Sequence, residues 1–307
     1  MGTAEVVAPL RAVSPLRANL TVGLRRLQEV WVQILHNRTA MAGLIILSFF
    51  TILAVAAPLI APYGPLQPVT DVPNYSLPGP GHPLGTDGLG DDIYSQVIWG
   101  TQISMIVGIL AAIVASVIGT AVGLISGYIG GWLDEVMMRF NDVVLSIPWL
   151  VLMIVVAARL SYIDLVGIIL VIGLTGWSIT ARVIRSQVLS IKERMFVERA
   201  KMVGSSNFHI LMRHVFPNAF PLIFANTILT VAVSILSESV LAFLNLSVRN
   251  NVSWGRIIAE AYNHQALTTG NPNWLIVPGL CIVFLVFGFY LFGFALDEIL
   301  NPRLRRR

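Results

Sequence analysis

Charged side chains are scarce in this sequence. Asp, Glu, Lys and Arg make up only 12% of its 307 residues, whereas 56% are apolar and the mean hydropathy is +0.78. A soluble domain carries roughly 25% charged residues, so this chain has too few polar side chains to cover a water-facing globule. The composition therefore excludes a soluble enzyme, a nucleic-acid-binding domain and a disordered scaffold, and it indicates an integral membrane protein.

Residues that carry chemistry are also few. Cys281 is the only cysteine, so no disulfide framework or cysteine zinc site can form within the chain. Neither Lys192 nor Lys201, the two lysines, follows a glycine, which excludes the Gly-Lys pair of a Walker A loop. The histidines lie outside the apolar runs and no His-Glu-x-x-His occurs, so neither an intramembrane serine protease nor a zinc protease is supported. We therefore expect no enzyme activity and no cofactor in this chain, and any energy source on a partner.

Long apolar runs, by contrast, are frequent. A helix that crosses a bilayer needs ~20 mostly apolar residues, because lipid offers no partner to unpaired backbone groups. Six runs qualify: Gly43–Ile60, Ile103–Tyr128, Val143–Ala158, Leu165–Ala181, Leu222–Leu244 and Leu275–Leu296. The third is short and contains Pro148, which neighbouring helices can shelter. None alternates every second residue as barrel strands do, so the sequence predicts an all-α protein with six transmembrane helices.

The distribution of basic residues predicts the orientation. Of the 20 Lys and Arg residues, 17 fall on one side of this topology and 3 on the other. The positive-inside bias then places both termini in the cytoplasm of a multi-pass plasma membrane protein. The expected segments are a cytoplasmic N-terminal segment (1–42), the first span (43–60), an extracellular proline-rich loop (61–101), a core of five spans (102–296) with the cytoplasmic loop 182–220, and a cytoplasmic basic tail (297–307).

The predicted extracellular loop 61–101 carries seven prolines and four aspartates but no Lys or Arg. So many prolines oppose a helix and favour stiff, extended backbone. A loop of this length is usually functional, although a mere spacer is an alternative. In the second long external connection a short helix is expected near Ile257–Tyr262.

The sequence of the predicted cytoplasmic loop 182–220 indicates a helix, a tight turn and a second helix. The first helix covers residues 185–202, with an apolar stripe of Val188, Ile191, Met195 and Met202. Gly204 is expected to end it, because glycine readily takes the left-handed conformation at a helix terminus. One of residues 205–207 can cap the second helix, and Pro217 with Asn218 is expected to break the chain before the fifth span.

A protruding hairpin of this kind can enter a groove on another protein. Ala200 and Gly204 are four residues apart, so we expect them to share a face whose small side chains permit close approach. Glu198, at the same bend, offers a carboxylate to a donor on the partner. A loop packed against the protein's own helices is the alternative.

Glu238 is an ionisable residue inside a predicted span, the fifth. A carboxylate at that depth is costly and usually faces a cavity or a partner. It could line a solute pathway, or it could pair with a neighbouring helix or a second subunit. Both interpretations remain open here, with the structural one favoured.

The segment 198–218 resembles the EAA loop of ABC importer permeases, whose pattern is Glu-Ala-Ala, three residues, Gly, nine residues and Ile-x-Leu-Pro. Matching residues are Glu198, Ala200, Gly204 and Pro217, and differing ones are Arg199, His214 and Phe216. The ending His-x-x-Pro-Asn is common in the dipeptide/oligopeptide branch. Residues 82–87, 142–148, 185–194, 238–246 and 253–255 also resemble, in order, the second permease of that branch, the DppC/OppC type. Asp91 departs from the resemblance, since the family more often has Arg there.

The resemblance implies a type I ABC importer permease with the MetI-like fold and no ATP site of its own. It implies a heterodimer with a DppB/OppB-like permease, two ATPase subunits that bind ATP and Mg, and an extracellular substrate-binding protein. The residues it assigns to coupling with the ATPase are Glu198, Ala200, Gly204, His214, Pro217 and Asn218. Dipeptides or oligopeptides are the expected solutes, with oligosaccharides, nickel or glutathione as alternatives. A six-helix channel or receptor without ATP coupling is the alternative of another class.

Overall fold

The computed structural model describes residues 28–69, 72–160, 164–248 and 251–300, so expectations on residues 1–27 and on the tail 301–307 lie outside it. Throughout these ranges the regular elements are helical, and extended backbone forms only isolated β-bridges. Residues 28–36 are helical. The elements after them are α2 (Arg38–Val55), α3 (Ala57–Ile60), α4 (Ile93–Ile129), α5 (Gly131–Ser146), α6 (Trp149–Ala158), α7 (Leu165–Lys192), α8 (Met195–Met202), α9 (Asn207–Ile210), the π-helical turn η1 (Leu211–Val215), α10 (Phe216–Phe243), α11 (Trp254–Asn263) and α12 (Asn273–Leu300).

Within the described ranges, five helices are long and apolar enough to cross a membrane, and a sixth span results if α5 and α6 count as one. These two helices meet at an angle of 83°. The predicted third span, Val143–Ala158, is therefore not one continuous helix. Ile147 is extended (φ −86°, ψ 126°) because the ring of Pro148 disfavours a helical conformation in the residue before it. At 1.5 Å per residue, the ten residues of α6 would reach only about 15 Å.

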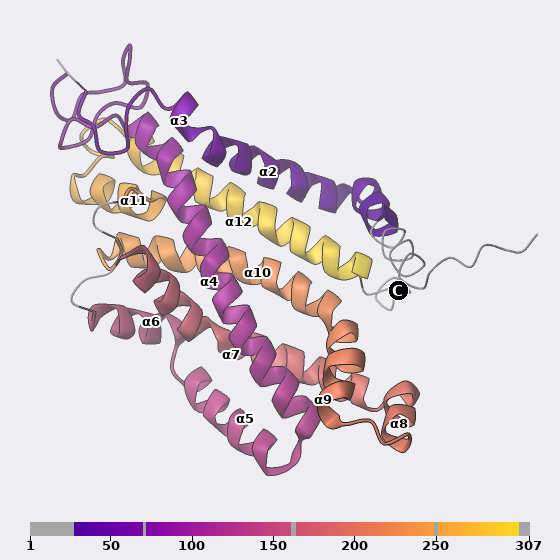
Figure 1. The fold of residues 1–307 in the computed structure, drawn as a ribbon. Helices are drawn as coiled ribbons and strands as arrows, with labels where there is room; N and C mark the ends of the chain where they lie inside the picture. Colours follow the sequence, from indigo (N-terminus) through magenta and orange to yellow (C-terminus); the bar gives the residue numbers. More distant parts are fainter. Residues whose placement is uncertain (1–27, 70–71, 161–163, 249–250, 301–307) are drawn as a thin grey trace, which may run out of the picture.

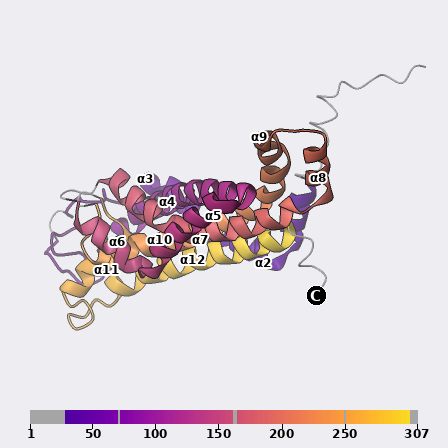
Figure 2. The same ribbon diagram turned by 90° about the horizontal axis from the view of Figure 1, so that it is seen from below.

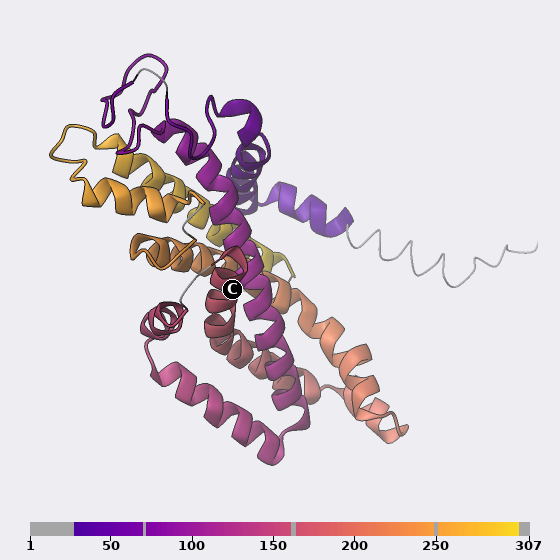
Figure 3. The same cartoon turned by 60° about the vertical axis from the view of Figure 1, so that its left-hand side comes forward.

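The long helices form a bundle with two distinct ends. Helices α2, α12 and α10 lie side by side, and α4 runs across them (Figure 1). Helices α8 and α9 project from one end, opposite the loop that precedes α4 (Figure 2). We call the end with α8 and α9 the hairpin end, and the end with the loop before α4 the loop end. Helices α5 and α6 lie along one edge of the bundle (Figure 3).

Glycines let α4 and α7 approach closely. A Cβ atom added at Gly119 would lie 2.6 Å from the carbonyl oxygen of Trp177, and one at Gly123 would lie 2.6 Å from that of Ala181. A Cβ atom added at Gly127, one turn further along α4, would lie 3.0 Å from the carbonyl oxygen of Arg185 in α7. Close backbone contact of this kind is how small residues hold transmembrane helices together, so these glycines serve helix packing.

The loop end carries a folded cap made from residues 61–69, residues 72–92 and α11. The Asp87 carboxylate organises it, because it accepts hydrogen bonds from the backbone N–H groups of Leu89 (2.8 Å) and Asp91 (2.9 Å) and from the Gln96 amide (2.7 Å). Asp91 is itself buried. Burial, and the nearby carboxylates of Asp87 and Glu260, raise its pKa to about 6.

Aromatic contacts attach this cap to the rest of the loop end. The Tyr75 hydroxyl lies 3.0 Å from His264 Nδ1, and the His264 ring stacks on Trp274. The fully buried Trp254 donates its ring N–H to the Val97 carbonyl at 2.9 Å. The helix expected near residues 257–262 is confirmed as α11, and residues 62–69 and 72–92 contain no helix, as the prolines predicted. The described part of this segment therefore has a defined fold, and its role stays a prediction.

Candidate functional site

The candidate site is the hairpin at the end of α7, which comprises residues 193–215. Helix α7 ends at Lys192 and a turn separates it from α8, so residues 185–202 do not form the single helix that the sequence predicted. Gly204 ends α8 with φ +82°, as expected. Its N–H donates to the Lys201 carbonyl (2.9 Å), while the Ser205 N–H donates to the Ala200 carbonyl (3.1 Å). These paired bonds form a Schellman motif, which satisfies the carbonyls at the helix end.

The second leg of the hairpin continues without a break into the bundle. Ser206 caps α9 by accepting a hydrogen bond from the His209 N–H, as one of the three expected capping residues. The predicted break at Pro217 is wrong, because residues Asn207–Phe243 form one long helix. The π-helical turn η1 ends two residues before the proline and shifts the hydrogen-bond register close to where Pro217 has no N–H to donate. Just beyond, the Asn218 side chain donates to the His214 carbonyl at 2.7 Å.

Buried side chains fix the hairpin to the bundle. Val197 of α8 and Ile210 of α9 are fully buried, and they form one apolar cluster with Leu124 of α4 and Ile191 of α7. The Tyr128 hydroxyl adds a hydrogen bond of 3.3 Å to the side chain of Asn207. Displacement of the hairpin must therefore displace the ends of α4 and α7 with it.

Several large apolar side chains of the hairpin are exposed, among charged ones such as Glu198 and Lys201. Its exposed side chains include Met195, Met202, Val203, Phe208 and Met212, with Val203 85% and Met202 79% exposed. The predicted stripe is thus only half correct, since Val188 and Ile191 are buried whereas Met195 and Met202 face outward. Such a group of large apolar side chains exposed on a projecting element, here called the apolar patch of the hairpin, indicates an interaction site. Apolar character in the sequence could have signalled this patch, but it did not distinguish contact with the protein's own core from contact with a partner.

The predicted coupling residues fall into two groups. Glu198 is exposed in the first turn of α8, Ala200 is partly buried against the cluster, and Gly204 stands in the turn, outside the helix. Ala200 and Gly204 therefore do not share a helix face as expected. The second group lies on the other leg, where His214 belongs to η1 and Pro217 and Asn218 are exposed at the start of α10.

Glu238 lies elsewhere, inside the bundle towards the loop end. Its side chain is fully buried, and the Ser104 hydroxyl of α4 lies 3.5 Å from its Oε2. Ser104 also accepts a hydrogen bond from the Trp254 N–H, so this position joins α10, α4 and α11. These contacts favour a structural role, and a role in the solute pathway stays a prediction. In the described ranges, no group of three or more His, Cys, Asp and Glu residues could hold a metal ion.

Comparison with known proteins is consistent with this arrangement. Residues 119–306 match the family described as binding-protein-dependent transport system inner membrane component, and residues 25–80 match the N-terminal transmembrane domain of oligopeptide transport permease C. A chain of the inward-facing MetNI methionine ABC transporter has a similar fold, with a TM-score of 0.54 and 19% identity over 69% of this chain and 97% of that one. The MetI-like permease fold is thereby confirmed.

Three relatives match almost the whole chain. The dipeptide transport permease DppC of Bacillus subtilis is 33% identical over 91% of this chain and 86% of its own length. The oligopeptide transport permease OppC of Salmonella typhimurium is 35% identical over 91% of both chains. The glutathione transport permease GsiD of Shigella flexneri is 33% identical over 90% of both.

These matches decide the class of the protein. It is a multi-pass inner membrane component of a transporter that works with a binding protein, and ATP hydrolysis takes place on separate subunits. A channel or receptor without ATP coupling is thereby excluded. The chain belongs to the OppC/DppC family of binding-protein-dependent ABC transporter permeases.

Proposed function

We propose that this chain forms half of the translocation pathway of a peptide importer. A homologous DppB/OppB-like permease forms the other half, and the partner ATPases bind ATP and Mg. The dipeptide and oligopeptide permeases among its relatives support peptides as the solute class. The excess of basic residues on one side supports a cytoplasmic location for both termini. In this orientation the hairpin end faces the cytoplasm and the loop end faces the binding protein.

The observation that carries the coupling role is the anchored hairpin with its exposed apolar tip. Burying a large apolar side chain such as Met202 or Phe208 in a partner's cleft stabilises the contact by roughly 1.5–3 kcal/mol each. Val197 and Ile210 are buried in one cluster with residues of α7 and α10. Closure of the two ATPases on the hairpin therefore moves α7 and α10 together with it, as rigid bodies. Glu198 adds a charged contact at the tip. This movement switches the pathway between its inward-facing and outward-facing states.

The test is Glu198→Arg in the complete transporter, reconstituted in liposomes with its binding protein. We expect loss of ATP-dependent peptide uptake with normal membrane insertion and persistent ATP turnover, because the reversed charge disturbs the contact with the ATPase. Glu135→Arg is the matched control, since Glu135 is also exposed but lies on α5. Wild-type uptake by the Glu198→Arg variant would refute the coupling role.

Glutathione import is the second candidate function, because the glutathione permease GsiD matches over the same length and at a similar identity. Glutathione is itself a small peptide derivative, so the same pathway chemistry would accommodate it. The ligand that the cognate binding protein retains on purification distinguishes the two. A bound peptide supports the first candidate, bound glutathione the second, and a bound sugar contradicts both.

A further inference from the structure

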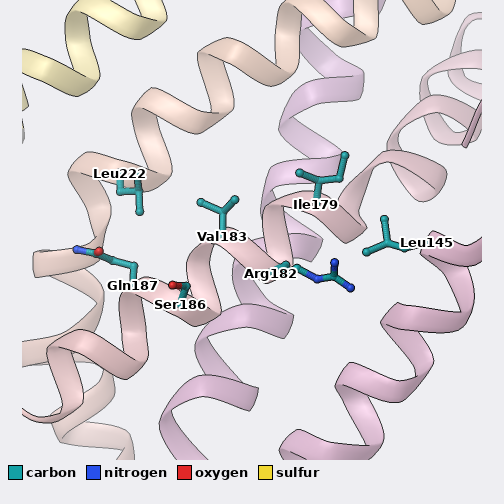
Figure 4. Close-up of a pocket in the computed structure, with 7 residues that line it drawn as sticks. All are labelled: Leu145, Ile179, Arg182, Val183, Ser186, Gln187 and Leu222. Carbon is teal, nitrogen blue, oxygen red and sulfur yellow. The ribbon is translucent and has the colours of Figure 1, made fainter.

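A cavity of about 650 Å³, wide open to the surface on one side, lies between α5, α7 and α10. Five of its lining residues are from one face of α7, namely Ile179, Arg182, Val183, Ser186 and Gln187, and Leu145 and Leu222 complete it from α5 and α10. Figure 4 shows Arg182 reaching from α7 towards α5, with Ser186 and Gln187 further along α7. The volume falls in the range of about 300–1,000 Å³ of small-molecule sites, which are mostly apolar with a few polar groups. This lining has that character.

Two Arg–Asp pairs join α5 to α7, and they differ in kind. Arg185 makes two hydrogen bonds of 2.6 Å to the Asp134 carboxylate, whose side chain is only 15% exposed. Arg182 makes one bond of 2.6 Å to Asp142, and both of these side chains are more than half exposed. The first pair is bidentate and sheltered, so it fixes the helices. In the second pair Arg182 lines the cavity, whereas Asp142 lies beside it as the partner of Arg182. An exposed pair of this kind is worth only about 0–1 kcal/mol.

Arg182 and Asp142 can therefore leave each other and bind oppositely charged groups of a ligand instead. A guanidinium binds a carboxylate in a planar, two-bond geometry, and an Asp carboxylate accepts from an ammonium group. Arg182 is 17 residues into α7, at about 25 Å along the helix by its rise of 1.5 Å per residue. Under the proposed orientation, this places Arg182 at the cytoplasmic end of the predicted span Leu165–Ala181, where a solute would leave the pathway.

We propose that this cavity binds the transported solute as a short zwitterionic peptide before its release into the cytoplasm. Arg182 binds the peptide's terminal carboxylate and Asp142 binds its terminal ammonium group. Ser186 and Gln187 hydrogen-bond to the peptide's amide groups. The apolar lining packs on the solute's side chains without demanding a particular one, which suits a pathway whose selectivity lies in a separate binding protein. This inference rests on the proposed import of peptides.

The test measures binding of three probes to the assembled permease–ATPase complex without the binding protein, by saturation-transfer NMR. The probes are dialanine, its C-terminal amide and its N-acetyl derivative. Replacing one partner of a charge-assisted hydrogen bond should weaken binding by about tenfold or more. We expect Arg182→Gln to weaken binding of dialanine and the N-acetyl form but not of the amide. Asp142→Asn should weaken binding of dialanine and the amide but not of the N-acetyl form.

Arg139→Gln is the charge-matched control, because Arg139 is exposed on α5 and does not line the cavity. If both cavity variants bind all three probes as the wild type does, the inference is wrong. It is also wrong if they reduce assembly with the second permease while the assembled fraction binds normally, since a partner helix would then fill the cavity. Failure of the wild-type transporter to import any peptide would instead overturn the proposed function.

A labelling experiment covers the case in which the Arg182 variant does not fold. Ser186→Cys in a Cys281→Ala background carries one thiol, at the cavity. We expect dialanine to slow its reaction with a water-soluble maleimide at least severalfold. The same reaction at Ser146→Cys, which is exposed on α5 and outside the cavity lining, should not change. Labelling of Ser186→Cys that is insensitive to dialanine would contradict the proposal.

Discussion

Replacement of Gly204 by alanine tests whether the turn geometry of the hairpin governs its stability. Gly204 has φ +82°, and a Cβ atom added there would meet no atom within 4 Å. The penalty is therefore purely one of backbone conformation, at about 1–2 kcal/mol for an L-residue in the left-handed region. This corresponds to a shift of roughly 5–30-fold in the local opening equilibrium. Gly204→Asn should destabilise the hairpin less, because asparagine tolerates this conformation better than alanine does.

Hydrogen exchange of the hairpin amides in the detergent-solubilised transporter measures this effect. We expect the amides of α8 and α9 to exchange faster in Gly204→Ala, with a smaller increase in Gly204→Asn and no change in α12. The order glycine, asparagine, alanine is the signature of backbone strain. Equal acceleration by the two substitutions would refute the reasoning, since it would mean that any side chain at this position is excluded by contact.

Three further predictions concern the loop end and the helix core. Asp91 has a raised pKa of about 6, so the folded state binds the carboxyl proton more tightly than the unfolded state does. Protonation of Asp91 therefore stabilises the fold, fully below about pH 4, and this stabilisation is lost as the pH rises through 6. Asp91→Asn should remove that dependence from thermal melts recorded between pH 4 and 8, and an unchanged pH profile would contradict this. Glu238→Gln should keep assembly, because an amide of the same shape fills the site, and unaltered uptake would remove Glu238 from the pathway. Gly123→Leu should prevent folding, as judged by size-exclusion chromatography, whereas Gly176→Ala, where a Cβ atom meets nothing closer than 3.7 Å, should be tolerated.

The transmembrane helices could be predicted because hydropathy is a local property, but the effect of each proline could not. Pro148 was expected to be sheltered within a span, yet α5 and α6 bend by 83° there. Pro217 was expected to break the chain, yet it lies within a continuous helix, as do Pro221 and Pro278. Whether a proline ends a helix depends on the hydrogen-bond register around it. A π-helical turn precedes Pro217, and no residue pattern indicated it.

The candidate site was predicted in part for a different reason. The turn could be predicted from Gly204 and from the capping residue Ser206, because each acts on the backbone next to it. The direction in which Met195 and Met202 face could not be predicted, since apolar residues serve equally for a core and for an interface. Arg182 and Asp142 are 40 residues apart, and they meet only because α5 and α7 run antiparallel. Such a pair becomes visible only when the helices are placed in space.

Helix α7 connects the two sites physically. It is continuous from Leu165 to Lys192, so the cavity face around Arg182 and the anchor at Ile191 belong to one rod. Two Arg–Asp pairs connect α7 to α5, so that α5 moves with it. The bidentate Arg185–Asp134 pair holds the helices firmly, whereas the exposed Arg182–Asp142 pair can open. A push on the hairpin is then transmitted along α7 to the cavity, because the helix is unbroken between the two. Under the proposed function, a peptide that replaces Asp142 as the partner of Arg182 loosens one of the two ties just when the ATPases act on the other end. Solute binding and ATP-driven movement therefore meet in the same helix.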